Sequence, residues 1–256
     1  MSQAALVETP TVREQVSPEE WKMRVDLAAC YRLVAYHGWD DLIFTHISAR
    51  VPGPEHHFLI NPYGMMFDEI TASSLVKVDM DANIVMDTPY GMNPAGFTIH
   101  SAVHGARPEV NCVLHLHTDD GVAVSCQEDG LLPLNQTSLA VRHDIAYHDY
   151  EGIALDWDER ERLVADLGAK NMMIQRSHGT LSCGESVAEA FLRIFFLERA
   201  CTMQVKALSG GRKLVTPSDA VQDVVTKQSA GICKIADLSW TALLRMLDRK
   251  NPGYAD

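Results

Sequence analysis

Long apolar runs are absent from this sequence: no segment approaches the ~20 consecutive apolar residues that a transmembrane helix needs. The N-terminal segment also lacks the basic and apolar regions of a secretory signal peptide. With 46% hydrophobic and 22% charged residues, the composition is that of a globular protein. We therefore expect a cytoplasmic protein with no membrane partner.

Cysteine is scarce and scattered, and basic residues are in deficit. The 6 cysteines include no Cys-x-x-Cys pair, which argues against a disulfide framework and against a thiolate zinc site. Lys and Arg number 22 against 34 Asp and Glu, which gives a net charge of -12. Because binding to a phosphate backbone requires a basic face, we expect no nucleic-acid partner.

Helical and strand-like segments alternate along the chain. Ser17 is a candidate N-cap, with Pro18 at the first helical position and Glu20 completing a capping box, and this helix should end before Gly38. Further helices are predicted over residues 95–107, 119–130, 156–168, 186–208 and 238–250. Strands are predicted over residues 42–51, 56–62, 74–80, 111–118, 145–152 and 171–179, with 83–88 as a further candidate and 180–185 as a turn.

This interleaving of strands, helices and short turns predicts an α/β protein, a three-layer α/β/α sandwich around one sheet. Residues 1–16 mix polar residues and proline without periodicity, so they are expected to form a flexible arm. Residues 17–211 then form the main domain. Residues 212–256 form a C-terminal extension, a polar connection followed by a helix.

Two histidines interrupt the apolar strand "VLHLHT". Side chains alternate along a strand, so His115 and His117 project from the same face and could share one divalent ion at about 2.0–2.1 Å per Zn–N bond. A third ligand must come from elsewhere, and His178 in "RSHG" is the leading candidate. The alternative is that these are ordinary hydrogen-bonded histidines, and the residue pattern alone leaves both interpretations open.

Four motifs, "FTHISAR", "INPYG", "ARPEVNCVLHLHT" and "RSHGTLSCGESVAEAF", resemble the class II aldolase and adducin head domain family over roughly residues 21–208. The run that contains the two histidines is more similar to the adducin heads. The resemblance implies a three-layer fold with a largely antiparallel sheet, and a homotetramer with active sites at subunit contacts. It also implies a divalent ion, usually zinc with manganese or iron as alternatives, held by the residues that match the family's three histidines: His115, His117 and His178.

The sequence departs from the aldolase pattern at the catalytic acid/base. The aldolases carry a Glu near the start of the helix before the His-x-His strand, and this chain has Gly96 there. The aldolases also have an adjacent Ser pair where this chain has Pro94 and Ala95. These changes remove the usual proton-transfer group and part of the phosphate site, so a sugar phosphate is a poor candidate substrate.

Other positions of the family's substrate site are retained or replaced. His46 stands in place of an Asn, Asn61 and Gly64 are retained from a third loop, and Gln136 replaces a Tyr that reaches toward the active site. The apolar run Tyr63–Phe67 follows that third loop and is compatible with either a pocket wall or core packing. The predicted substrate-binding residues are therefore His46, Asn61, Gly64 and Gln136.

A three-histidine ion leaves coordination positions open, which is typical of a catalytic site. Such an ion can act as a Lewis acid that stabilises an enolate while a C–C bond breaks. Loss of carbon dioxide needs no base to deprotonate a hydroxyl, so a site without the Glu favours decarboxylation of a small hydroxy, keto or aromatic carboxylate over an aldolase reaction. The candidate proton donors are His100, His148 and Tyr150, with Tyr147 beside them, each of which could instead be structural.

Two other functions remain open. The first is a non-catalytic, adducin-like oligomeric scaffold, although retention of all three histidines favours an enzyme. The second is a non-haem iron oxygenase, since three facial histidines can hold Fe(II). In the C-terminal extension, an apolar helical stripe is predicted to pack on a neighbouring subunit: Trp240, Leu243, Leu244 and Leu247.

Overall fold

One mixed sheet forms the centre of the protein. The computed structural model describes residues 10–153 and 156–256. Within them the strands are β1 (His46–Arg50), β2 (Phe58–Ile60), β3 (Val76–Val78), β4 (Cys112–Leu116), β5 (Ile145–His148), β6 (Met172–Gln175) and β7 (Gly179–Gly184). They form a 7-stranded sheet in the order β3-β2-β1-β4-β7-β6-β5. Among the described strands only β5 and β6 pair in parallel, so the predicted largely antiparallel sheet is confirmed.

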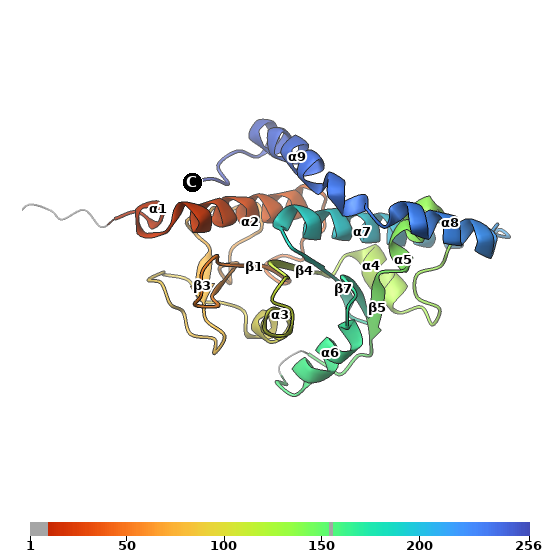
Figure 1. Cartoon of the computed structure of the whole chain (residues 1–256), viewed down its shortest axis with the longest axis horizontal. Helices are drawn as coiled ribbons and strands as arrows, with labels where there is room; N and C mark the ends of the chain where they lie inside the picture. Colours follow the sequence, from red (N-terminus) through yellow and green to blue (C-terminus); the bar gives the residue numbers. More distant parts are fainter. Residues whose placement is uncertain (1–9, 154–155) are drawn as a thin grey trace, which may run out of the picture.

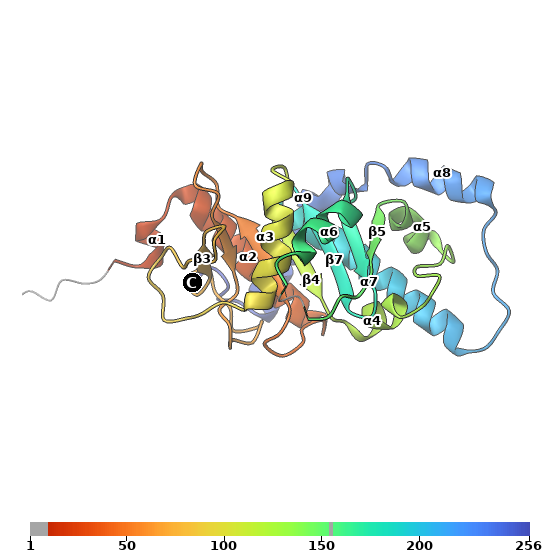
Figure 2. The ribbon, with the colours of Figure 1, turned by 90° about the horizontal axis from the view of Figure 1, so that it is seen from below.

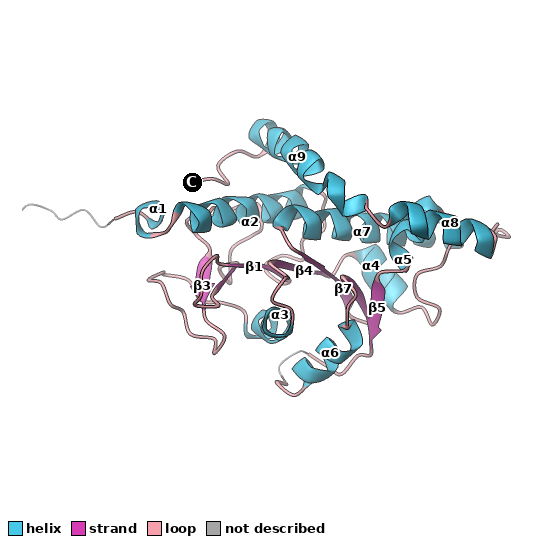
Figure 3. Ribbon diagram, in the orientation of Figure 1, coloured by secondary structure: helices cyan, strands magenta, loops and turns pink. Residues whose placement is uncertain are grey.

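Helices cover both faces of the sheet, which confirms the three-layer fold (Figure 1, Figure 3). One layer holds α2 (Pro18–Tyr36), α4 (Asp119–Ser125), α5 (Gln136–Arg142) and α7 (Val187–Ser209). Outside these helices lie α8 (Asp219–Ser229), a 3-10 turn (Ile232–Ile235) and α9 (Ala236–Lys250). The other layer holds α3 (Pro94–Ala106) and α6 (Glu159–Leu167), which lie across the sheet in Figure 2. None of the helices described is both long enough and apolar enough to span a bilayer.

The first long helix begins where its sequence predicts. Ser17 Oγ accepts from the Glu20 backbone N–H at 3.1 Å, and Pro18 occupies the first position of α2. The predicted capping box is wrong, however, because the Glu20 carboxylate lies against Arg24 at 3.0 Å and Lys77 at 2.8 Å. This buried ion pair holds β3 against α2, and it offsets the desolvation of an Arg24 side chain that is fully buried.

Residues 180–184 of the predicted turn 180–185 belong to the central strand β7, so that prediction is wrong. Side chains alternate between the two faces of β7, but those on one face are polar. The buried hydroxyls of Thr180 and Ser182 face α7, and Ser182 Oγ donates to Ala190 O at 2.9 Å. The predicted strand at 83–88 is a single bridge between Val78 and Ile84. Helices α5 and α8 were not predicted.

The structure describes the C-terminal end of the chain fully and the N-terminal end in part. Of the predicted arm, residues 1–9 lie outside the described residues, and residues 10–16 contain a capped helical turn, α1 (Val12–Gln15). The apolar stripe of α9 contacts its own chain through Trp240, and its packing on a neighbouring subunit stays a prediction. Trp240 is buried against Phe191, with ring centroids 5.9 Å apart, and its Nε1 donates to Asp26 Oδ1 at 3.0 Å.

Trp240→Ala is therefore expected to lower the free energy of unfolding by about 3–5 kcal/mol, because it deletes a buried aromatic side chain. The matched control is Leu238→Ala in the same helix, since Leu238 is 75% exposed. That variant should change stability by no more than about 0.5 kcal/mol. Urea unfolding of the two variants at equal protein concentration measures the difference, and equal effects would contradict the observed packing.

Candidate metal centre

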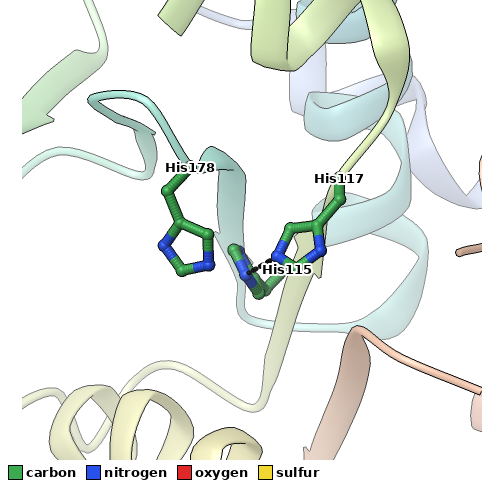
Figure 4. Close-up of side chains that lie close together, drawn as sticks. All are labelled: His115, His117 and His178. Atoms are coloured by element: carbon green, nitrogen blue, oxygen red, sulfur yellow. Dashed lines mark hydrogen bonds between the residues drawn. The ribbon is translucent and has the colours of Figure 1, made fainter. Parts of the chain in front are cut away.

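Three histidines converge at one end of the central strands. His115 is in β4, His117 follows this strand directly, and His178 lies in the turn before β7, so two adjacent strands deliver all three (Figure 4). Their ring centroids are 4.7, 4.7 and 4.9 Å apart, and one ligand nitrogen from each lies within 4.8 Å of the others. The structure thus brings together the three residues that the sequence singled out.

The hydrogen bonds behind these rings fix where their lone pairs point. His115 Nδ1 donates to Thr180 O at 3.1 Å, and His117 Nδ1 donates to Asp41 Oδ2 at 3.1 Å. When both rings are neutral their protons are at Nδ1, so both Nε2 atoms carry only lone pairs. These two atoms face each other at 2.9 Å. Two lone pairs at that distance repel each other unless a cation lies between them, so this donor set fits a divalent ion.

The environment keeps two of these imidazoles, His115 and His178, uncharged. Burial, together with the neighbouring histidines, holds the pKa of His115 well below its ordinary value. Burial is also the main cause that lowers the pKa of His178 to about 4, with His117 adding to it. Because only the neutral ring can be a metal ligand, both residues are in the state that binding requires near neutral pH.

The turn that carries His178 lies unusually close to β4. A Cβ atom at Gly179 would be 2.3 Å from Leu116 O, so only glycine fits there. Ser177, two residues earlier, has a φ of 53°, in the left-handed region that L residues seldom adopt. This backbone presses the turn against the end of β4 and positions His178 beside His115 and His117.

A cavity of about 420 Å³ opens in front of the three histidines. Thr45 in its wall has a φ of 61°, rare for a β-branched residue, and its buried Oγ1 lacks a hydrogen-bond partner among the described residues. An unpaired hydroxyl in a strained residue at a cavity wall indicates a ligand-binding position. The lining is otherwise mixed apolar and polar: Asp41, Phe44, His46, Tyr63, Asn93, Ala95, Ile99, Tyr150, Gly152 and Ile153.

The three predicted proton donors have different positions. Tyr150 lines the cavity, with its ring centroid 6.2 Å from that of His178. His148 does not line it, because its Nδ1 donates to Asp166 Oδ2 at 2.7 Å on the α6 side. His100 lies behind His46, with its Nε2 2.9 Å from His46 Nδ1, so it cannot contact a ligand directly. Tyr147 is also outside, since its hydroxyl accepts from Leu131 N at 3.0 Å.

The pattern of the Class II Aldolase and Adducin N-terminal domain family matches residues 25–205. The chain belongs to this family. A protein of Caulobacter vibrioides, provisionally named an aldolase class 2 protein, is 62% identical over 97% of each chain. Mouse alpha-adducin is 43% identical over 91% of this chain, which matches 33% of the adducin. The crystal structure of an aldolase II superfamily protein from Pseudomonas syringae aligns with a TM-score of 0.93 at 55% identity, covering 96% of this chain and 100% of that one.

Within this class II aldolase and adducin fold, only one of the four predicted substrate-binding residues lines the cavity, namely His46. Asn61 is buried, with its Oδ1 accepting from the Tyr31 hydroxyl at 2.9 Å, and it links β2 to α2. Gly64 permits a φ of 106° in the loop beside Tyr63, but does not itself line the cavity. Gln136 is exposed at the start of α5, away from the cavity of its own chain. Sequence reasoning missed Asp41, which lies in the irregular loop before β1, and Thr45, which belongs to the "FTHISAR" motif but was not singled out.

The missing Glu of the aldolases has a structural counterpart. At Gly96, a Cβ atom would lie 2.6 Å from Cδ2 of His46, so the imidazole occupies the space next to this helix position. Gly96 and His46 are therefore sterically coupled, because the imidazole fits only where residue 96 has no side chain.

Gly96→Ala is expected to destabilise the protein by about 1–3 kcal/mol through overpacking, although alanine is the better helix former. In a His46→Ala background the ring is absent, and the same substitution should be neutral or stabilising. Urea unfolding of all four proteins gives the coupling free energy between the two positions. An equal cost in both backgrounds would contradict the contact.

Proposed function

We propose that this protein is a divalent-metal-dependent lyase that breaks a C–C bond, with His115, His117 and His178 as the metal ligands. The observation that carries the proposal is the geometry of His115 and His117: each Nδ1 donates to an oxygen, and the two Nε2 atoms face each other. Three protein ligands leave a coordination position for substrate, as in catalytic zinc sites. Zinc is the preferred ion, with manganese or iron as alternatives. When bound, the ion would supply Lewis-acid stabilisation of the enolate left by the departing carbon.

Decarboxylation of a small hydroxy, keto or aromatic carboxylate is the preferred reaction. Gly96 supplies no carboxylate base, which the alternative aldol cleavage of a hydroxyl-bearing substrate would use. The cavity wall carries Phe44, Tyr63 and Ile99, which suit a planar or apolar substrate. Tyr150 is the residue placed to return a proton to carbon, because it alone of the predicted donors lines the cavity.

The test is turnover by protein loaded with one equivalent of zinc, manganese or iron. The substrates are hydroxy acids, β-keto acids and aromatic carboxylates, assayed for carbon dioxide and for aldehyde under argon. Carbon dioxide without aldehyde supports the decarboxylase, and aldehyde supports the aldolase. Turnover only in the presence of oxygen would replace both with the oxygenase reaction. No turnover by a fully loaded protein would count against any lyase.

An adducin-like, non-catalytic scaffold is the second candidate, and the 43% identity to mouse alpha-adducin favours it. In that case His115→Ala should leave assembly unchanged. We further propose a homotetramer with the cavities at subunit contacts, since Tyr150 and Ile153 at the cavity rim are 53% and 74% exposed in the single chain. Light scattering after gel filtration measures the assembly, and a monomer would exclude shared sites.

A further inference from the structure

A continuous chain of four polar side chains runs from the cavity into the layer between the sheet and α3. His46 and Ser48 are two residues apart on β1, so their side chains lie on the same face of the sheet. His100 and His104 are one turn apart on α3. His46 Nδ1 lies 2.9 Å from His100 Nε2, and Ser48 Oγ lies 2.5 Å from His100 Nδ1 and 2.7 Å from His104 Nε2. All four side chains are buried, so water does not compete for these bonds.

The far end of this chain determines its direction. His104 Nδ1 lies 3.4 Å from Val110 O, and a carbonyl can only accept, so the proton of His104 is at Nδ1. Its Nε2 then accepts from the Ser48 hydroxyl, whose oxygen accepts from His100 Nδ1–H. His100 Nε2 in turn accepts from His46 Nδ1–H. All three rings are buried, which favours their neutral forms, and burial lowers the pKa of His104 to about 3.

At the cavity end, this direction leaves His46 Nε2 without a proton. His46 lines the cavity, and its Nδ1 is already engaged by His100, so Nε2 is the nitrogen available to a ligand. The neighbouring Thr45 Oγ1 is a donor without a partner in the described residues. An acceptor and a donor thus stand side by side in the cavity wall that also contains His115 and His117.

We propose that Ser48, His100 and His104 are positioning residues that hold His46 as a hydrogen-bond acceptor for a substrate hydroxyl, so that the site selects a hydroxy carboxylate. The Thr45 hydroxyl donates to the carboxylate of the same molecule. This inference rests on the proposed lyase function and narrows its substrate class to acids that carry a hydroxyl group in addition to the carbonyl or aromatic ring that takes up the electron pair. The three positioning residues do not contact the substrate, and they act through the tautomer of His46.

Neutron diffraction from deuterated crystals of the chelator-treated protein tests the tautomer without metal or turnover. Deuterium at Nδ1 of His46, His100 and His104, with none at His46 Nε2, is the expected result. Deuterium at His46 Nε2 would overturn the proposal and leave the lyase function standing. This measurement decides the question even if substitutions in the buried chain prevent folding.

Binding selectivity supplies the second measurement. Zinc-loaded protein should bind glycolate more tightly than acetate, and Ser48→Ala should reduce this ratio about 10-fold, as expected for one hydrogen bond of about 1.4 kcal/mol. Ser48→Thr retains the hydroxyl and should restore the ratio, while both variants keep one zinc per chain. A ratio that Ser48→Ala leaves unchanged would show that the chain has only a structural role.

Discussion

His115→Ala and His178→Ala should each abolish stoichiometric metal binding, with an affinity loss of more than about 100-fold. Replacing even an outer partner of a metal-bound histidine costs about 10–100-fold, and removal of a ligand costs more. Both residues contribute one of only three nitrogens that converge in the described chain. Elemental analysis of protein purified without added metal, followed by competition with a chromophoric chelator, measures the content and the affinity.

His143→Ala is the matched control, because His143 is exposed and is not one of the three converging histidines. It should keep one equivalent of metal. Asp41→Asn should lower the metal affinity by only about 10-fold, because it weakens the acceptor of His117 Nδ1 but leaves the three ligands in place. Equal and negligible metal in all of these proteins would contradict the metal centre and favour the scaffold. Circular dichroism must show that each variant is folded.

The local pattern was sufficient to predict the ligands but not their surroundings. His115 and His117 are i, i+2 on a strand, so their common face follows from the alternation of side chains. Asn61 was expected in the cavity from its loop motif, but its side chain pairs with Tyr31 of α2. That contact joins residues 30 positions apart, and no local pattern encodes it.

The same limit applies to β7 and to the His46 chain. Thr180 and Ser182 are not apolar enough to indicate a buried strand. They lie in a central strand because they pair with β4 and pack against α7. The link from His46 through His100 and Ser48 to His104 appears only when α3 is packed on β1. The sequence predicted His46 and His100 as separate functional residues, and the fold makes them one chain.

Glu198 in α7 supports the metal centre from behind. Its carboxyl oxygens accept from the hydroxyls of Thr118 and Thr180. Thr118 follows His117 and caps α4, and Thr180 provides the carbonyl to which His115 donates. One side chain therefore joins the elements that carry both histidines, although it does not line their cavity.

Glu198→Ala is expected to lower the free energy of unfolding by about 3–5 kcal/mol, because it leaves a cavity and two buried hydroxyls without acceptors. Glu198→Gln keeps one acceptor and adds one donor, which a threonine hydroxyl can accept, so it should cost far less. Urea unfolding in the presence of a chelator separates these effects from metal binding. Equal destabilisation of the two variants would show that neither the lost side-chain volume nor the lost hydrogen bonds cause the decrease in stability.

The pH dependence gives an independent measure of the same residue. Burial raises the pKa of Glu198 from 4.5 to about 7, against the lowering effect of the two threonine hydroxyls. Because the folded-state pKa is raised, the protonated carboxyl group stabilises the folded protein. This contribution to the free energy of unfolding is complete below pH 4.5 and is lost as the pH rises through about 7. Between pH 4.5 and 8 the wild-type protein should therefore lose up to about 3 kcal/mol relative to Glu198→Gln, which does not titrate. A constant difference over that range would mean that Glu198 stays ionised in the folded protein.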